Sequence, residues 1–305
     1  MKKLLFALCL FYIHVVEAQN VLEPKEFLGY ELGSRFTQHY KVVDYFRHVA
    51  DVAATVELKQ YGETYEHRPL IYAVISSVDN LRNLEQIRTD NLRRTGLQEG
   101  TPSATKKAII WLSYNVHGNE ASSLEASMLT LYALANSQNA KIQEWLKNTI
   151  VILDPCINPD GRDRYANFYT QYFNTTPNED YDAKEHHEPW PGGRPNHYLF
   201  DLNRDWAWAT QRETQFRLKA YHEWMPHVHV DFHEQGFKKR MPIFYKNRHS
   251  LSLLQITILL RDSFCISYHF HKGMVRFFQL QYPYGLAAEA HAHAYHPFEQ
   301  HQLNL

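Results

Sequence analysis

Cysteine, net charge and long hydrophobic runs are all scarce in this chain of 305 residues. Its three cysteines, Cys9, Cys156 and Cys265, are too few for the disulfide framework of a small secreted domain. The formal net charge of -1 excludes a general electrostatic attraction to nucleic acids or anionic membranes. Beyond the N-terminus, no segment approaches the about 20 apolar residues that a membrane-spanning helix needs. We therefore expect neither a nucleic-acid partner nor a membrane-embedded mature protein.

The N-terminus has the features of a secretory signal peptide over residues 1–18. Lys2 and Lys3 supply the positive charge, residues 4–16 form the apolar stretch, and Ala18 ends a small-residue cleavage site. A short N-terminal helix of the mature protein is the alternative interpretation. The signal peptide predicts a secreted or periplasmic protein.

The rest of the chain alternates between strand-like and helix-like segments. The apolar run at residues 108–113 is typical of a strand that is buried on both faces. Such alternation predicts an α/β fold with a mixed, largely parallel central sheet flanked by helices. Residues 170–197 are rich in Asn, Pro, Gly and Asp and predict a long loop, of a kind that is usually functional or disordered. The predicted strands are 56–61, 70–76, 108–113, 150–153 and 227–232, and the predicted helices are 41–53, 79–95, 124–134 and 211–224.

Three side chains with metal-ligand chemistry follow two of these strands. His117 and Glu120 come just after the strand at 108–113, and His233 comes just after the strand at 227–232. Ligands of α/β sheets bind at the carboxyl ends of the strands, so we expect the three side chains to meet. Two imidazoles and a carboxylate suit Zn²⁺ and leave its fourth position open for water, as in a catalytic site.

Other polar residues precede His233 on the same strand face, because alternate residues of a strand point the same way. His227 and His229 lie too far from the strand end, and we interpret them as satisfied or partly exposed histidines. Asp231 has two interpretations: it orients a ligating imidazole, or it only stabilises its strand.

Asn203 and Arg204 stand side by side in Asp201-Leu-Asn-Arg204. A guanidinium makes bidentate pairs with carboxylates, and the neighbouring amide adds a directional donor. The pair could recognise a substrate carboxylate; a salt-bridged loop is the alternative.

Taken together, these segments resemble the zinc carboxypeptidase family of the carboxypeptidase A/B type, over roughly residues 25–236. Five landmarks occur in the family's order, and His67 replaces a Gly of the first one. They are Tyr61-Gly-Glu-Thr-Tyr-Glu-His-Arg-Pro69, Ser113-Tyr-Asn-Val-His-Gly-Asn-Glu120, Asn158-Pro-Asp-Gly161, Asp201-Leu-Asn-Arg204 and Asp231-Phe-His233.

The resemblance implies a role for each matching residue. His117, Glu120 and His233 would bind one zinc ion per chain, whose bound water attacks the peptide bond. Asn203 and Arg204 would hold the C-terminal carboxylate of the peptide.

The family also uses an arginine to stabilise the oxyanion of the transition state. Arg194 is the first candidate for this role, and Arg162 and Arg164 are alternatives. Asn119 stands where digestive members carry an Arg, so one substrate contact is expected to be missing.

The family's general-base Glu and catalytic Tyr cannot be identified from the sequence. Only three of the 33 acidic residues lie in residues 237–305, which carry no family landmark. The weak candidates are Glu289 and Glu299 for the base, and Tyr268, Tyr282 and Tyr284 for the tyrosine.

The sequence therefore divides into a signal peptide (1–18), a zinc carboxypeptidase-like catalytic domain (19–236) and a C-terminal segment (237–305). A truncated, out-of-frame or divergent end is one hypothesis for the last segment. The predicted function is hydrolysis of the C-terminal residues of peptides or cell-wall peptide by a zinc metallocarboxypeptidase. The alternatives are a catalytically impaired, peptide-binding pseudoenzyme and a related zinc amidohydrolase or deacylase. The oligomeric state is not indicated.

Overall fold

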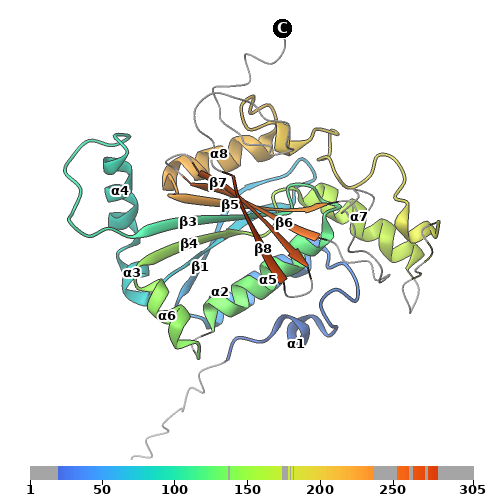
Figure 1. The fold of residues 1–305 in the computed structure, drawn as a ribbon, viewed down its shortest axis with the longest axis horizontal. Coiled ribbons are helices and arrows are strands. Elements are labelled where there is room, and N and C mark those ends of the chain that lie inside the picture. Colours follow the sequence, from blue (N-terminus) through green and yellow to red (C-terminus); the bar gives the residue numbers. More distant parts are fainter. Residues whose placement is uncertain are drawn as a thin grey trace, which may run out of the picture.

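The centre of the molecule is an eight-stranded sheet with the order β1-β2-β4-β3-β5-β6-β7-β8 (Figure 1). The computed structural model describes residues 20–136, 138–173, 178, 180, 182–235 and the backbone of strands β6 to β8. The predicted signal peptide, residues 1–18, lies outside the described residues. The strands are β1 Val56–Glu63, β2 Pro69–Ile75, β3 Ala108–Tyr114, β4 Thr149–Asp154, β5 Val228–Gln235, β6 Leu253–Leu260, β7 Phe264–His271 and β8 Met274–Leu280.

The strands pair in both directions, which confirms the predicted mixed sheet, but the expectation that the sheet is largely parallel is wrong. Strand β3 runs parallel to β4 and β5, and every other neighbouring pair is antiparallel. Parallel pairing is thus confined to the three central strands. Strand β5 is longer than predicted and includes His233, but its pairing with β3 stops at Tyr114 and Phe232. His233 therefore still projects beyond the end of β3.

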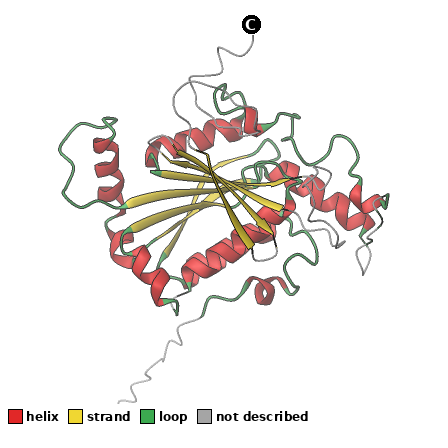
Figure 2. Cartoon of the chain, viewed as in Figure 1, coloured by secondary structure: helices red, strands yellow, loops and turns green. Residues whose placement is uncertain are grey.

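Helices cover both faces of the sheet (Figure 2). The predicted helix at 79–95 is two helices, because Asn83 leaves the helical conformation and its amide donates to the Asp79 carbonyl at 2.8 Å. The predicted loop at 170–197 starts with the end of α7. Within the described residues, no helix combines the length and apolarity needed to cross a membrane. The helices are α1 Pro24–Leu28, α2 His39–Val52, α3 Val78–Arg82, α4 Leu84–Arg94, α5 Ala121–Ala135, α6 Ala140–Leu146, α7 Pro159–Tyr172 and α8 Arg212–Trp224, with 3₁₀ turns η1 Lys184–His186 and η2 Leu202–Arg204.

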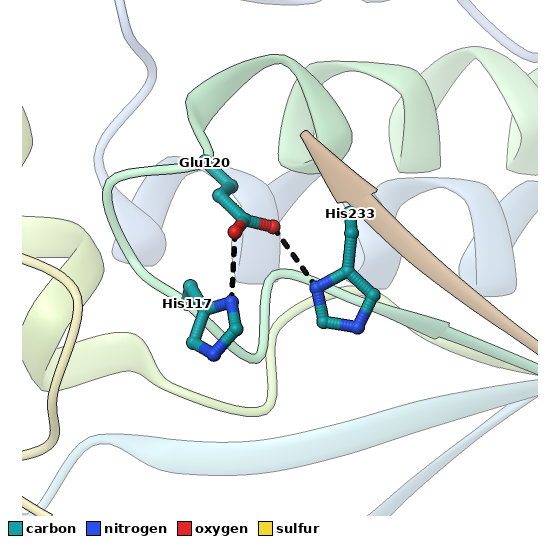
Figure 3. A group of neighbouring side chains, drawn as sticks. All are labelled: His117, Glu120 and His233. Atoms are coloured by element: carbon teal, nitrogen blue, oxygen red, sulfur yellow. Dashed lines mark hydrogen bonds and ion pairs between the residues drawn. The ribbon is translucent and has the colours of Figure 1, made fainter. Parts of the chain in front are cut away.

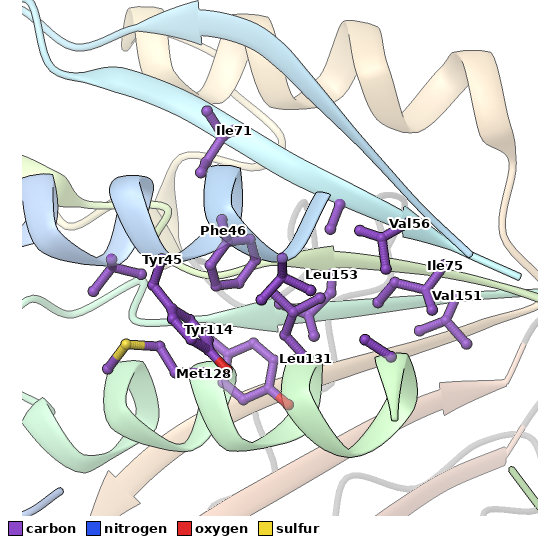
Figure 4. Close-up of a cluster of buried hydrophobic side chains, with 14 of the residues drawn as sticks. Tyr45, Phe46, Val56, Ile71, Ile75, Tyr114, Met128, Leu131, Val151 and Leu153 are labelled. Carbon is purple, nitrogen blue, oxygen red and sulfur yellow. The ribbon is translucent and has the colours of Figure 1, made fainter. Parts of the chain in front are cut away.

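Alternate residues of the central strands form two separate hydrophobic cores. Ile71 of β2 and Leu153 of β4 pack with α2 and α5 on one face (Figure 4). Trp111 of β3 and Ile152 of β4 pack with α8 on the other face. Because these strands are buried on both sides, their sequences are continuous apolar runs. The two cores hold the carboxyl ends of β3 and β5 side by side, which is where the candidate ligands lie.

Candidate metal centre

The three predicted ligands meet at the carboxyl ends of β3 and β5 (Figure 3). His117 and Glu120 lie in the short loop between β3 and α5. The buried Asn115 shapes this loop, because its amide donates to the carbonyls of His117 at 2.9 Å and Glu120 at 3.0 Å. Asn115 has a positive φ of 55°, which Asn tolerates better than most residues.

Glu120 lies between the two imidazoles. Its Oε1 is 2.8 Å from Nδ1 of His117, and its Oε2 is 3.1 Å from Nδ1 of His233. One ligand atom from each of the three residues falls within 4.8 Å of the others. Two nitrogens and one oxygen that converge in this way fit the preferences of Zn²⁺.

A carboxylate lies at the far side of each imidazole ring. Nε2 of His117 is 3.0 Å from Oδ1 of Asp201, and Nε2 of His233 is 3.1 Å from Oδ2 of Asp231. Histidines that bind metals commonly donate their second N–H to such a group, which fixes the ring and its tautomer. This contact supports the interpretation of Asp231 as an orienting residue.

The pKa values of the group show that the pocket favours positive charge. Burial opposes ionisation of Glu120, but hydrogen bonds from His117 and His233 outweigh it and lower the Glu120 pKa to about 2. Burial likewise disfavours charge on His233, yet Asp231 and Glu120 raise the His233 pKa to about 10. Binding of a divalent cation would replace this proton, as metal binding to histidine requires.

Of the three candidate arginines, only Arg194 lies against the ligand group. Its guanidinium is 3.0 Å from Asp201 and 3.6 Å from Glu120, and its side chain is 45% exposed. Arg162 is completely buried and pairs with Glu125 at 2.8 Å.

The remaining candidate, Arg164, donates to backbone carbonyls of the 192–196 segment, including that of Gly192 at 2.8 Å. It therefore braces the loop that carries Arg194. The backbone of the 192–196 segment also packs closely against the loop that carries His117 and Glu120. A Cβ on Gly118 would come within 2.6 Å of the Gly193 carbonyl and would collide with the backbone of Gly161.

Asn203 and Arg204 lie in η2, whose N-cap is Asp201. The Asn203 side chain is buried, and its backbone N–H donates to Asp201 Oδ1 at 2.9 Å. The pair is thus tied to the residue that contacts His117. Asn119, within the ligand loop, donates to Glu188 at 2.5 Å.

The candidates for the general base and the tyrosine cannot be placed. Glu289, Glu299, Tyr282 and Tyr284 lie outside the described residues, and only the backbone of Tyr268, in β7, is described.

His227 and His229 have structural partners, as predicted. Nδ1 of His227 accepts from the Ile109 N–H at 3.1 Å, and the buried His229 lies 2.9 Å from the Ser113 hydroxyl. Two other residues were missed as site residues: Asp201 begins one of the landmarks, and Glu234 directly follows another. Asp201 contacts His117, and Glu234 accepts from the Ser122 hydroxyl at the start of α5 at 2.5 Å.

A buried arginine on α8, Arg217, interacts electrostatically with Asp231. The guanidinium of Arg217, on α8, stacks on the ring of Trp206 at 3.8 Å and makes no hydrogen bond to any described residue. Its strongest electrostatic partner is Asp231, and Asp154 and Tyr61 also act on it. Burial raises the pKa of Asp154 to about 7, although the Tyr61 hydroxyl donates to it at 2.8 Å.

Glu66, Asp160 and His197 form another group that could hold a cation by spacing alone. The guanidinium of Arg68 already lies 2.5 Å from Glu66 and 2.7 Å from Asp160. The positive charge is therefore supplied by the protein, and the group is an ion-pair network.

Comparison with known proteins confirms the resemblance to the zinc carboxypeptidases. The family model described as zinc carboxypeptidase matches residues 42–302, and so it continues past residue 236, where the landmarks stop. A search of curated proteins gave no significant match.

Solved carboxypeptidase structures also resemble the chain at low identity. Carboxypeptidase A from Helicoverpa armigera is 16% identical with a TM-score of 0.44, covering 67% of this chain and 47% of that one. A metallo-carboxypeptidase from Burkholderia cenocepacia is 14% identical with a TM-score of 0.40, covering 69% and 46%. Bovine thrombin-activatable fibrinolysis inhibitor is 15% identical with a TM-score of 0.44, covering 71% and 67%. The chain spans less than half the length of the first two. With the family model matching most of its length, the chain belongs to the zinc carboxypeptidase family.

Proposed function

We propose that this protein is a zinc-dependent metallocarboxypeptidase that removes C-terminal residues from peptides. One observation carries the proposal: both imidazoles turn Nδ1 toward Glu120 while a carboxylate faces each Nε2. This arrangement presents three donor atoms to one ion, one fewer than the four of a tetrahedral site.

The residues around the ligands suit peptide hydrolysis at a chain end. When bound, zinc supplies a Lewis acid that polarises the scissile carbonyl and lowers the pKa of a coordinated water. Arg194 would donate to the developing oxyanion, an interaction of a kind worth about 3 to 4 kcal/mol. Asn203 and Arg204 would hold the terminal carboxylate, which selects the last peptide bond.

The signal-like N-terminus supports action outside the cytoplasm, on peptides or on cell-wall peptide. We propose no nucleic-acid partner, since a net charge of -1 does not produce a general attraction to nucleic acids.

Metal analysis combined with C-terminal ladder sequencing of a peptide pool tests this function. We expect one zinc per chain and stepwise loss of C-terminal residues. Zinc binding without any cleavage by the folded protein would instead favour a pseudoenzyme. Cleavage of acylated amino acids but not of peptides would favour an amidohydrolase or deacylase.

A further inference from the structure

Residues 196–200 form a tight turn that is fixed from inside the protein. The completely buried Asn196 donates its backbone N–H to the Phe200 carbonyl at 3.0 Å. Its side-chain oxygen accepts from the Phe200 N–H at 3.0 Å, and its amide donates to Gln211 at 2.9 Å. With both backbone groups of Phe200 engaged by Asn196, the turn is held in one conformation.

This rigid turn presents large apolar side chains to solvent. Leu199 is 44% exposed and Phe200 is 48% exposed, while the ring of Tyr198 packs edge-on against Tyr65 at 4.6 Å. Single exposed apolar residues are ordinary, but neighbouring ones on a fixed support mark a contact surface. Two further exposed aromatics, Trp190 and Trp208, precede and follow this segment in the sequence.

Leu199 occupies a backbone conformation that disfavours its side chain. Its φ of 67° lies in the left-handed region, where Gly or Asn is the usual residue and a bulky side chain is an outlier. Local strain of this kind concentrates at functional sites. A glycine at this position would relieve the strain. The leucine side chain is therefore not explained by the stability of the fold.

The turn leads directly into the candidate active site. Phe200 precedes Asp201, which contacts both His117 and Arg194. Asn203 and Arg204, which would hold the downstream end of a substrate, follow Asp201, whereas the turn precedes it. A substrate with its scissile bond at the ligand group would therefore present its upstream residues to this turn.

We propose that Leu199 and Phe200 form an apolar subsite for the substrate residues upstream of the cleaved bond. This inference rests on the proposed carboxypeptidase function. It makes the protein selective for peptides whose residues before the scissile bond are apolar, independently of which C-terminal residue is removed.

Two pentapeptides with the same C-terminal residue test the subsite, one with Leu and Phe upstream and one with Ser and Gly. We expect the wild type to prefer the apolar peptide by about tenfold in kcat/KM, the scale of one small apolar contact. Phe200→Ser and Leu199→Gly should each lower this preference severalfold, mainly through KM. The fall in kcat/KM caused by each substitution should be larger for the apolar pentapeptide than for a blocked dipeptide. Trp145→Ser, an exposed tryptophan of α6 at the other end of β4, is the matched control.

Leu199→Gly also gives a readout that a structural role would not. Its melting temperature should equal or exceed that of the wild type, while its preference for the apolar peptide falls. An unchanged preference in both variants would overturn the subsite, and so would a lower melting temperature of Leu199→Gly with unchanged preference. If the wild type binds zinc and peptide without cleaving, calorimetric Kd values of the same peptides decide the question. A wild type that neither binds nor cleaves any peptide would overturn the proposed function itself. Loss of preference only in a concentration-dependent dimer would assign the turn to self-association and contradict the proposal.

Discussion

Two groups of charged side chains lie on either side of Asp231, and they handle charge in different ways. Toward the sheet end, Oδ2 of Asp231 meets His233 in a set of short contacts between groups that can exchange protons. Toward α8, Asp231 interacts with Arg217, whose permanent charge stacks on Trp206 and has no hydrogen bond to any described residue. The first arrangement can accept a metal in place of a proton, whereas the second can only supply a fixed counter-charge. We infer that one group serves function and the other serves stability, and the following variants separate the two.

His117→Ala should have the largest effect, and the effect should be on metal binding. Two ligands remain in this variant, so zinc should no longer copurify, and activity should be lost with it. Zinc content after dialysis measures metal binding, and a circular dichroism spectrum shows whether the variant is folded. His222→Ala, on the exposed face of α8, should retain zinc. Stoichiometric zinc in folded His117→Ala would exclude this ligand assignment.

Arg217→Met should instead act on folding. Removing the buried guanidinium takes away its attraction to Asp231 and its stacking on Trp206, which should cost about 1 to 3 kcal/mol. Urea denaturation should show this loss in the free energy of unfolding. Lys219→Met, an exposed residue of the same helix, should change it by less than about 0.5 kcal/mol. Equal stability of the two variants would show that Arg217 is not a structural counter-ion.

Asp231→Asn should affect zinc binding first, because Asp231 orients His233. Loss of such a partner typically weakens metal affinity by about 10- to 100-fold. Competition with a chelator measures this, with the exposed Asp79→Asn as the matched control. Unaltered zinc affinity would place Asp231 wholly in the Arg217 group.

Asp154→Asn should produce the smallest effect, a change in pH dependence. The Asp154 pKa rises from 3.8 to about 7 on folding, so the native state binds more protons than the unfolded state between these values. Stability contributed by this group is therefore complete below pH ~4 and is lost as the pH rises toward ~7. The free energy of unfolding, measured by denaturation at several pH values in this window, should depend less on pH in Asp154→Asn than in the wild type. The same slope in both proteins would argue against a protonated Asp154.

The sequence was a good guide to the elements and to the ligands. The apolar run at 108–113 is β3 Ala108–Tyr114, and the helical pattern at 211–224 is α8 Arg212–Trp224. His117, Glu120 and His233 could be found because the polar residues after two buried strands must meet at one edge of a sheet.

What the sequence could not indicate are contacts between distant residues that lack a shared pattern. Asp201 reaches His117 across 84 positions, and only the path of the loop brings them together. Arg217 occupies a buried position of a helix whose periodicity gives no warning of a charge there. The division of residues 79–95 into two helices depends on a local hydrogen bond of Asn83, which competes with the helix.

The central claim is that one zinc ion binds His117, Glu120 and His233 and no sulfur ligand. Zinc X-ray absorption spectroscopy of protein loaded with one equivalent of the metal tests it most directly. We predict a first shell of nitrogen and oxygen at about 2.0 to 2.2 Å with the scattering pattern of two imidazoles, lost in His117→Ala. A sulfur shell near ~2.3 Å, or an unchanged spectrum in His117→Ala, would contradict the account.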